Sequence, residues 1–134
     1  MDRHDDPTIN GDMVLLRRIP PYGDRVQWDD RTGEPTPSSQ NFKDRNNELS
    51  TFLAAEITAD AALAGHDGFG LVQFTAGRVR EALGSGIIFC RDTSDPTPGH
   101  VIICGKVTDG MARRFRSIAS WVPGRWPARL RPEA

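Results

Sequence analysis

The chain has 134 residues, of which 37% are hydrophobic and 26% charged, so it has the size and composition of one globular domain and not of a disordered chain. No apolar run approaches the roughly 20 residues that a membrane span needs, and the N-terminus MDRHDDPTING is polar and acidic. We therefore expect a soluble cytoplasmic protein that does not bind membranes, and the net charge of −1 argues against nucleic acid as its partner.

The charges are unevenly distributed along the chain. Residues 1–60 carry 7 basic and 12 acidic side chains, whereas residues 61–134 carry 10 basic and 6 acidic ones. The second half could attract a polyanion, but for a near-neutral chain we favour charge compensation within the molecule. The basic residues are 15 Arg and 2 Lys, a bias typical of GC-rich bacterial genomes, and we expect a bacterial origin.

Three parts are predicted: a flexible N-terminus over residues 1–12, one α+β domain over 13–122, and a C-terminal tail over 123–134. In the domain, residues 13–19 and 25–28 read as extended segments joined by the turn PPYGD. Residues 29–47 are rich in Pro, Gly, Ser, Asn and charge, which predicts a long surface loop of the kind that is functional or mobile.

Helical patterns follow this loop. Apolar residues at helical spacing predict a helix beginning near residue 49, and a second short helix is capped within 58–60 and ends at Gly65. The first of these patterns consists of Leu49, Phe52, Leu53 and Ile57. A strand is predicted over 68–74, then a helix between the cap Thr75 and the stop Gly84. The segment TDGMARRFRSIASWV predicts an amphipathic helix packed on the sheet.

The segments GIIFC and HVIIC are apolar runs separated by the turn-forming sequence RDTSDPTPG, which predicts an antiparallel hairpin over 86–90/100–104. The fold class is therefore α+β, with a mixed or mainly antiparallel sheet and two to four helices. The simplest register places Cys90 opposite His100 and Gly86 opposite Cys104. His100 and Cys104 then lie roughly 13 Å apart along the strand, which excludes a Cys90–Cys104 disulfide and one metal held by all three side chains.

This register leaves Cys90 beside His100. A histidine can hold a cysteine as thiolate, and Asp92 or Asp95 in the loop could orient the imidazole, which is the arrangement of a nucleophilic site. The alternative, which we favour, is that Cys90 is a small core residue and His100 a turn residue.

Arg78 and Arg80 begin the helix after the 68–74 strand, and Lys106 follows the hairpin. If strand ends and helix starts share one crevice, these side chains could bind phosphate or carboxylate together with His100. The alternative, which we favour, is a solvated basic face.

Arg17 and Arg18 close the first strand, and a Ser-rich stretch and a Glu follow later in the chain. This order resembles the layout of ADP-ribosyltransferase-like folds. The resemblance implies a dinucleotide held by Arg17 or Arg18 and supported by Ser50, with Glu81 activating the acceptor. The Gly-Arg-Trp element at 124–126 is also similar to one found in a branch of these enzymes, although Glu81 falls on a predicted helix where the family has a strand.

The C-terminal region combines arginines with tryptophans, a composition that suits contact with an acidic partner or stacked bases, although tryptophans also commonly pin a tail to its domain. The candidate partner-binding residues are Arg113, Arg114, Arg116, Trp121 and Trp126. We expect a small binding or regulatory protein that uses this surface and the 29–47 loop to bind a protein partner, and the sequence identifies no cofactor and no metal site. The alternative is a small enzyme, with a Cys90/His100 nucleophile or a pocket for a nucleotide or other small anion.

Overall fold

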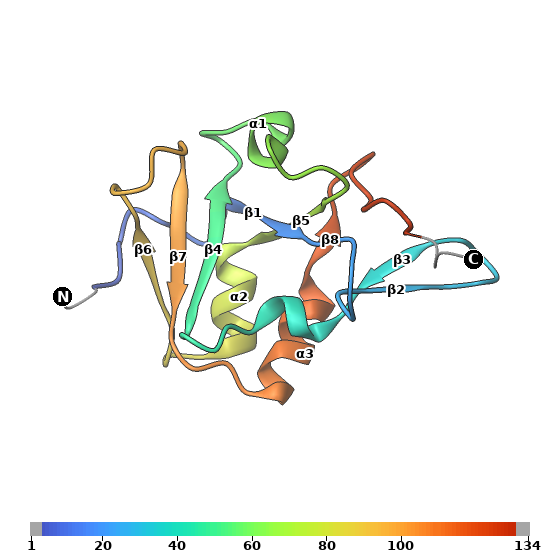
Figure 1. The fold of residues 1–134 in the computed structure, drawn as a ribbon. Coiled ribbons are helices and arrows are strands. Elements are labelled where there is room, and N and C mark those ends of the chain that lie inside the picture. Colours follow the sequence, from blue (N-terminus) through green and yellow to red (C-terminus); the bar gives the residue numbers. More distant parts are fainter. Residues whose placement is uncertain (1–3, 131–134) are drawn as a thin grey trace.

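Six antiparallel strands form one sheet in the computed structural model, which describes residues 4–130. Their order across the sheet is β6-β7-β4-β1-β5-β8, and the short strands β2 and β3 pair with each other beside it (Figure 1). The strands are β1 Val14–Ile19, β2 Val26–Trp28, β3 Pro35–Pro37, β4 Glu48–Leu53, β5 Gly70–Thr75, β6 Ile88–Arg91, β7 His100–Cys104 and β8 Ser120–Trp121. The helices are the 3-10 helix η1 Ser39–Phe42 and the α-helices α1 Ala59–Leu63, α2 Ala76–Leu83 and α3 Asp109–Ile118. The predicted α+β class with a mainly antiparallel sheet is confirmed.

The two faces of the sheet differ in their cover. Side chains alternate along a strand, so Leu15 and Phe74 point toward α2 and α3, while Leu16 and Leu71 point the other way. On the first face Phe115 of α3 lies against Phe42 and Phe74, with ring centroids 4.7 and 4.8 Å apart. On the second face α1 covers a smaller apolar cluster, and further along β4 the side chain of Ser50 is exposed.

The helix predicted near residue 49 is wrong, because residues 48–53 form the strand β4. Leu49 and Leu53 do lie at helical spacing, but Thr51 between them is also fully buried, and its hydroxyl donates to Val101 O over 2.8 Å. Leu49, Thr51 and Leu53 lie on one face of β4 at the two-residue period of a strand, and Phe52 is buried on the other face, so the apolar spacing at 49, 52 and 53 also fits a strand. The second part of the prediction is confirmed, since Thr58 accepts a hydrogen bond from Ala61 N and caps α1.

The other helix boundaries follow their predicted signals. Thr75 caps α2 by accepting a hydrogen bond from Arg78 N, and Gly84 ends the helix with φ 80°. Thr108 caps α3 by accepting from Met111 N. The sequence signals at both ends of α2 were therefore sufficient, whereas the cap of α3 at Thr108 was not predicted.

The segments outside residues 13–122 lie against the domain over their described lengths. Asp6 N donates to Phe89 O over 2.7 Å, and Ile9 is buried. The tail is bound to β5 at Arg125, whose backbone O accepts a hydrogen bond from Leu71 N over 3.0 Å. Among the described residues, no helix is both long and apolar enough to cross a membrane.

Candidate functional site

The hairpin of β6 and β7 has a different register from the predicted one. Cys90 pairs with Ile102, and the pairing of Cys90 with His100 is wrong. Strand β6 continues to Arg91, opposite Val101, and Asp92 N then donates to His100 O over 3.0 Å. The position facing His100 is therefore an aspartate.

Both cysteines are free thiols. Cys90 is buried, and its Sγ donates to His4 O over 3.2 Å. Cys104 lies on the neighbouring strand, opposite Ile88. Cys90 thus has the position of a small core residue, which is the interpretation that we favoured.

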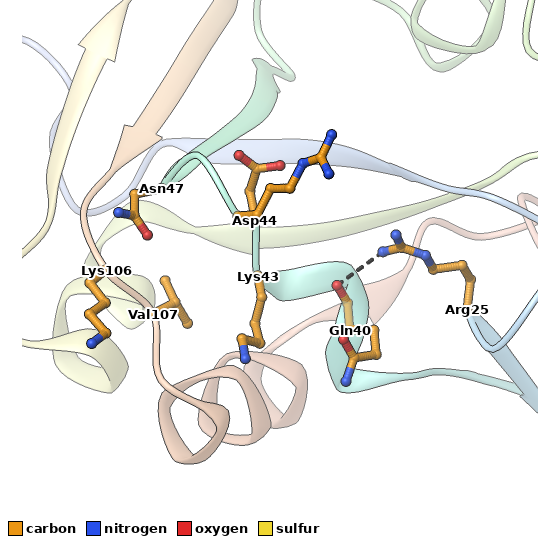
Figure 2. Close-up of a pocket in the computed structure, with 8 residues that line it drawn as sticks. Arg25, Gln40, Lys43, Asp44, Asn47, Lys106 and Val107 are labelled. Atoms are coloured by element: carbon orange, nitrogen blue, oxygen red, sulfur yellow. Dashed lines mark hydrogen bonds between the residues drawn. The ribbon is translucent and has the colours of Figure 1, made fainter.

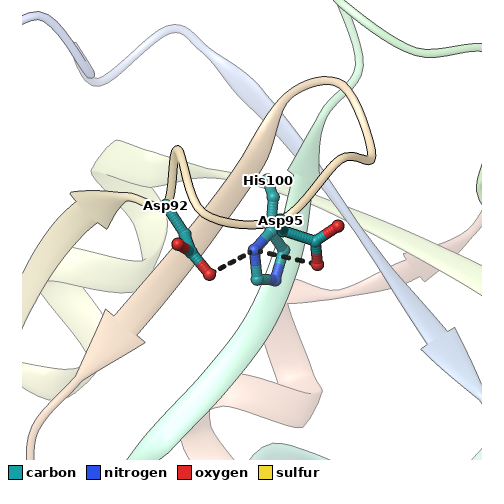
Figure 3. A group of neighbouring side chains, drawn as sticks. All are labelled: Asp92, Asp95 and His100. Atoms are coloured by element: carbon teal, nitrogen blue, oxygen red, sulfur yellow. Dashed lines mark hydrogen bonds and ion pairs between the residues drawn. The ribbon is translucent and has the colours of Figure 1, made fainter.

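His100 is the centre of a polar cluster on the second face of the sheet. Its side chain is only 6% exposed, and its Nδ1 lies 3.0 Å from Asp92 Oδ2 and 3.4 Å from Asp95 Oδ2 (Figure 3). Its Nε2 lies 3.1 Å from Ser50 Oγ. The loop aspartates therefore contact one nitrogen of the imidazole, and the side chain at the other nitrogen is a serine hydroxyl and not the Cys90 thiol.

The two carboxylates are held by their own loop. Hydrogen bonds from the side chain and the backbone of Ser94 lower the pKa of Asp92, and His100 adds to this effect. Hydrogen bonds from Thr97 lower the pKa of Asp95 in the same way. Both groups are ionised at neutral pH and can only accept hydrogen bonds, so in the neutral form of the imidazole the ring proton is on Nδ1 and Nε2 accepts from Ser50.

The same cluster has the composition of a divalent-cation site. Asp92, Asp95 and His100 offer one ligand atom each, and these atoms lie within 4.8 Å of one another. Carboxylate and imidazole ligands are both common for such cations. A cation here would take the place of the proton on Nδ1.

Next to His100, aromatic and cationic contacts extend across β4 to β1. The Phe52 ring centroid lies 5.4 Å from that of His100, and Arg18 Cζ lies 4.5 Å from the Phe52 centroid. Burial lowers the pKa of Arg18, and the Asp95 carboxylate partly offsets this effect. Arg18 therefore belongs to the surroundings of the His100 cluster.

The residues implied by the resemblance to ADP-ribosyltransferase-like folds are not assembled. Arg18 and Ser50 lie on one face, but Arg17 points to the other face and donates to Asn41 O over 2.6 Å. Glu81 is an exposed residue of α2, the helix that covers that other face. The resemblance fails because α2 holds the acidic residue on the wrong side of the sheet.

The predicted 29–47 loop contains β3 and η1, and a second polar site, a basic pocket of about 610 Å³, lies between its residues 40–47 and the segment after β7 (Figure 2). Gly105 N donates to Asn47 O over 3.0 Å and so holds these two segments together. Lys43 and Lys106 point in the same direction from them. The residues that line the pocket are Arg25, Gln40, Lys43, Asp44, Arg45, Asn47, Lys106 and Val107.

Several charges of this basic pocket are already engaged. Arg25 donates to Gln40 O, and Lys43 is paired with Asp109. The Asp44 carboxylate accepts from the backbone amides of residues 46 and 48. Within residues 4–130, Arg45 and Lys106 have no hydrogen-bond or ion-pair partner, so two cations of the pocket are available to a ligand.

Arg17 adds positive charge beside the basic pocket. Burial lowers its pKa to about 10, the Asp44 carboxylate opposes this effect, and Arg25 contributes to it. Arg17 stays charged at neutral pH, and its Nη1 donates to Ser50 O over 2.8 Å. Neither the hydrophobic pattern nor any motif places Arg17 or Arg25 here, because their positions depend on the path of the loop.

The predicted cluster of Arg78, Arg80 and Lys106 does not form, since Lys106 alone lines the basic pocket. Arg80 donates to Ile9 O over 2.8 Å and lies over the Phe89 ring. Arg78 lines a smaller pocket of about 200 Å³ with Arg114. Helix α2 starts at the end of β5, and two strands, β1 and β4, separate β5 from β7, after which Lys106 follows.

The C-terminal arginines and tryptophans have different environments. Trp121 donates its indole N–H to Pro35 O over 2.8 Å and packs against the core, whereas Trp126 is 49% exposed. Arg114 donates to Ala82 O. Arg113 is exposed on α3, and Arg116 is partly buried.

No protein-family model, curated protein or solved structure matches this chain. Its function is therefore inferred from the two polar sites.

Proposed function

We propose that this protein is a small bacterial cytoplasmic binding protein that recognises a phosphate or carboxylate group in the basic pocket. The observation that supports the proposal is that Arg45 and Lys106, two cations without partners among the described residues, both line this pocket. They come from segments about sixty residues apart in the chain, so the fold is needed to bring them together.

The chemistry of the pocket favours a compact polyanion. Its volume of about 610 Å³ lies within the range of small-molecule sites, roughly 300–1,000 Å³. Arginine can bind two oxygens of one phosphate or carboxylate, and lysine supplies a point charge. Arg25 and Lys43, already bound to Gln40 O and Asp109, add to the positive potential.

Calorimetric titration with pyrophosphate at low ionic strength tests this proposal. We expect Lys106→Ala and Arg45→Ala each to weaken binding about tenfold, because a hydrogen bond to a charged group contributes about 1.5–3 kcal/mol. Arg31→Ala is the matched control, since Arg31 is exposed in the turn between β2 and β3, and it should bind as the wild type does. Citrate and a short acidic peptide, titrated in parallel, separate a phosphate from a carboxylate and a free ligand from a protein segment. If none of these anions binds, or if both variants bind like the wild type, the proposal is wrong.

A protein partner would contact the molecule outside the pocket as well. For this contact we propose the exposed residues Arg113 and Trp126. Trp121 is not part of it, because its indole N–H donates to Pro35 O. An Arg113→Glu variant should lose partners in a pull-down that the wild type retains. An unchanged set of partners would contradict this surface.

A further inference from the structure

We propose a second activity at the His100 cluster: Ser50 is a nucleophile that His100 activates, and the protein hydrolyses carboxylic esters on the second face of the sheet. Asp92 is the positioning residue. This activity is independent of the basic pocket and involves no residue that lines it.

The distances are those of a serine with its general base. Ser50 Oγ lies 3.1 Å from His100 Nε2, and His100 Nδ1 lies 3.0 Å from Asp92 Oδ2. Both fall within the hydrogen-bond reach that a nucleophile, a base and an orienting carboxylate need, about 2.6–3.2 Å. The Nδ1 proton is directed to the carboxylate, so the lone pair of Nε2 faces the hydroxyl.

The burial of the three side chains suits their roles. Ser50 is exposed, so a substrate can reach its hydroxyl, whereas the His100 side chain is 6% exposed. Asp92 is intermediate, with 21% of its side chain exposed. The base is thus shielded from water while the nucleophile remains accessible.

The fold fixes all three positions. Ser50 and His100 stand on the paired strands β4 and β7, where His100 lies directly opposite Phe52. Asp92 is tied to β7 through its own amide, which donates to His100 O, and its carboxylate is held by Ser94. Sites supported by strands and by a second set of hydrogen bonds hold their geometry well.

The reaction balances without a co-reactant other than water. Ser50 Oγ attacks the ester carbonyl carbon, and its proton moves to His100 Nε2. The C–O bond to the alcohol breaks, and the alcohol leaves with that proton, which leaves an acyl ester on Ser50. Water then adds with His100 again taking a proton, and the carboxylic acid and free Ser50 are released.

A metal ion at the same cluster would prevent this chemistry. A cation bound by Nδ1 and the two carboxylates leaves the ring proton on Nε2, which then donates to Ser50 and cannot accept its proton. The esterase proposal therefore predicts that a chelator leaves the reactivity of Ser50 unchanged and that added Zn²⁺ lowers it.

Labelling with a fluorophosphonate, which forms a bond to an activated serine oxygen and releases fluoride, tests the proposal. We expect mass spectrometry to find the label on Ser50 and p-nitrophenyl acetate to be hydrolysed. The label should be lost in Ser50→Ala and retained in Ser85→Ala, a second exposed serine. His100→Gln should slow labelling by about 10²-fold or more, and Asp92→Asn should slow it while leaving the fold intact by circular dichroism.

Because His100 is buried, its variant could unfold, so the Ser50→Cys variant provides a second test that keeps the histidine. A thiol at this position should react with iodoacetamide faster than Cys104 does, and Zn²⁺ should slow that reaction. The absence of label on folded wild-type protein, labelling at another serine, or a label on Ser50 that is indifferent to both Asp92→Asn and Zn²⁺ would each overturn the proposal.

Discussion

A single glycine determines how the two segments of the basic pocket meet. Gly105 has φ 137°, and an added Cβ would lie 2.7 Å from Gly86 O. Its amide donates to Asn47 O, and Lys106 is the next residue. Only a residue without a side chain allows this close approach, so the position of Lys106 depends on glycine at 105.

Gly105→Ala should lower the free energy of unfolding by about 2–4 kcal/mol, because it adds a clash with backbone to an unfavourable φ. Gly23→Ala is the control, since Gly23 also has a positive φ, 68°, but an added Cβ would meet no atom within 4 Å. That variant should lose only about 1–2 kcal/mol. Urea denaturation measures both, and equal losses would show that the contact with Gly86 is not important.

The Asp92 carboxylate should make stability depend on acid pH. Its pKa is lowered in the folded protein, mainly by the hydrogen bonds from Ser94. The stabilisation is complete above the unfolded pKa of about 3.9 and is lost as the pH falls through the lowered folded value. Wild type should therefore be more stable than Asp92→Asn at pH 6, and the difference should shrink toward pH 2. A difference that is constant with pH would contradict this.

At the level of secondary-structure elements, the sequence predicted those features that depend on residues close together in the chain. Thr75 and Gly84 marked the ends of α2, and the acidic residues of the β6–β7 loop were expected near His100 because this loop leads directly into it. The partner of His100 on its other side was not predictable in this way. Ser50 reaches His100 only because β4 is a strand beside β7, and the apolar spacing around Leu49 indicated a helix instead.

The N-terminal cap of α3 can be used to measure how much a local hydrogen bond contributes to the free energy of unfolding. Thr108→Ala removes the hydroxyl that accepts from Met111 N, and we expect a loss of about 1 kcal/mol of unfolding free energy. Thr93→Ala, at an exposed threonine of the β6–β7 loop, should change stability by less than about 0.5 kcal/mol. Thermal unfolding followed by circular dichroism would show both effects, and a neutral Thr108→Ala would mean that packing alone sets the start of α3.

For the whole molecule, the acidic first half of the sequence and the basic second half form ion pairs with each other. In the part of the chain that the structure describes, five ion pairs join an acidic residue before position 61 to an arginine after it. They are Asp5–Arg80, Asp6–Arg91, Glu56–Arg91, Asp60–Arg125 and Asp30–Arg129. This agrees with charge compensation within the molecule, the interpretation that the composition favoured.

These pairs predict a sensitivity to salt. Raising NaCl from 0.05 to 0.5 M should reduce the unfolding free energy of the wild type, by less than about 1 kcal/mol for each pair, because exposed pairs are weak and screened. The double variant Glu56→Gln/Asp60→Asn should lose less over the same range. Chemical denaturation at the two salt concentrations makes the comparison, and parallel losses would indicate that the pairs contribute nothing.

The N-terminal segment lies along β6, at one border of the sheet. Asp6 N donates to Phe89 O, and the Asp5 carboxylate accepts from Phe89 N over 2.9 Å. A border strand otherwise presents free backbone donors and acceptors to which another chain can add a strand. At the opposite border β8 has only two residues, too few for such an addition. The N-terminal segment thus occupies the outward backbone groups of Phe89, so a second chain cannot pair with this residue of the border strand.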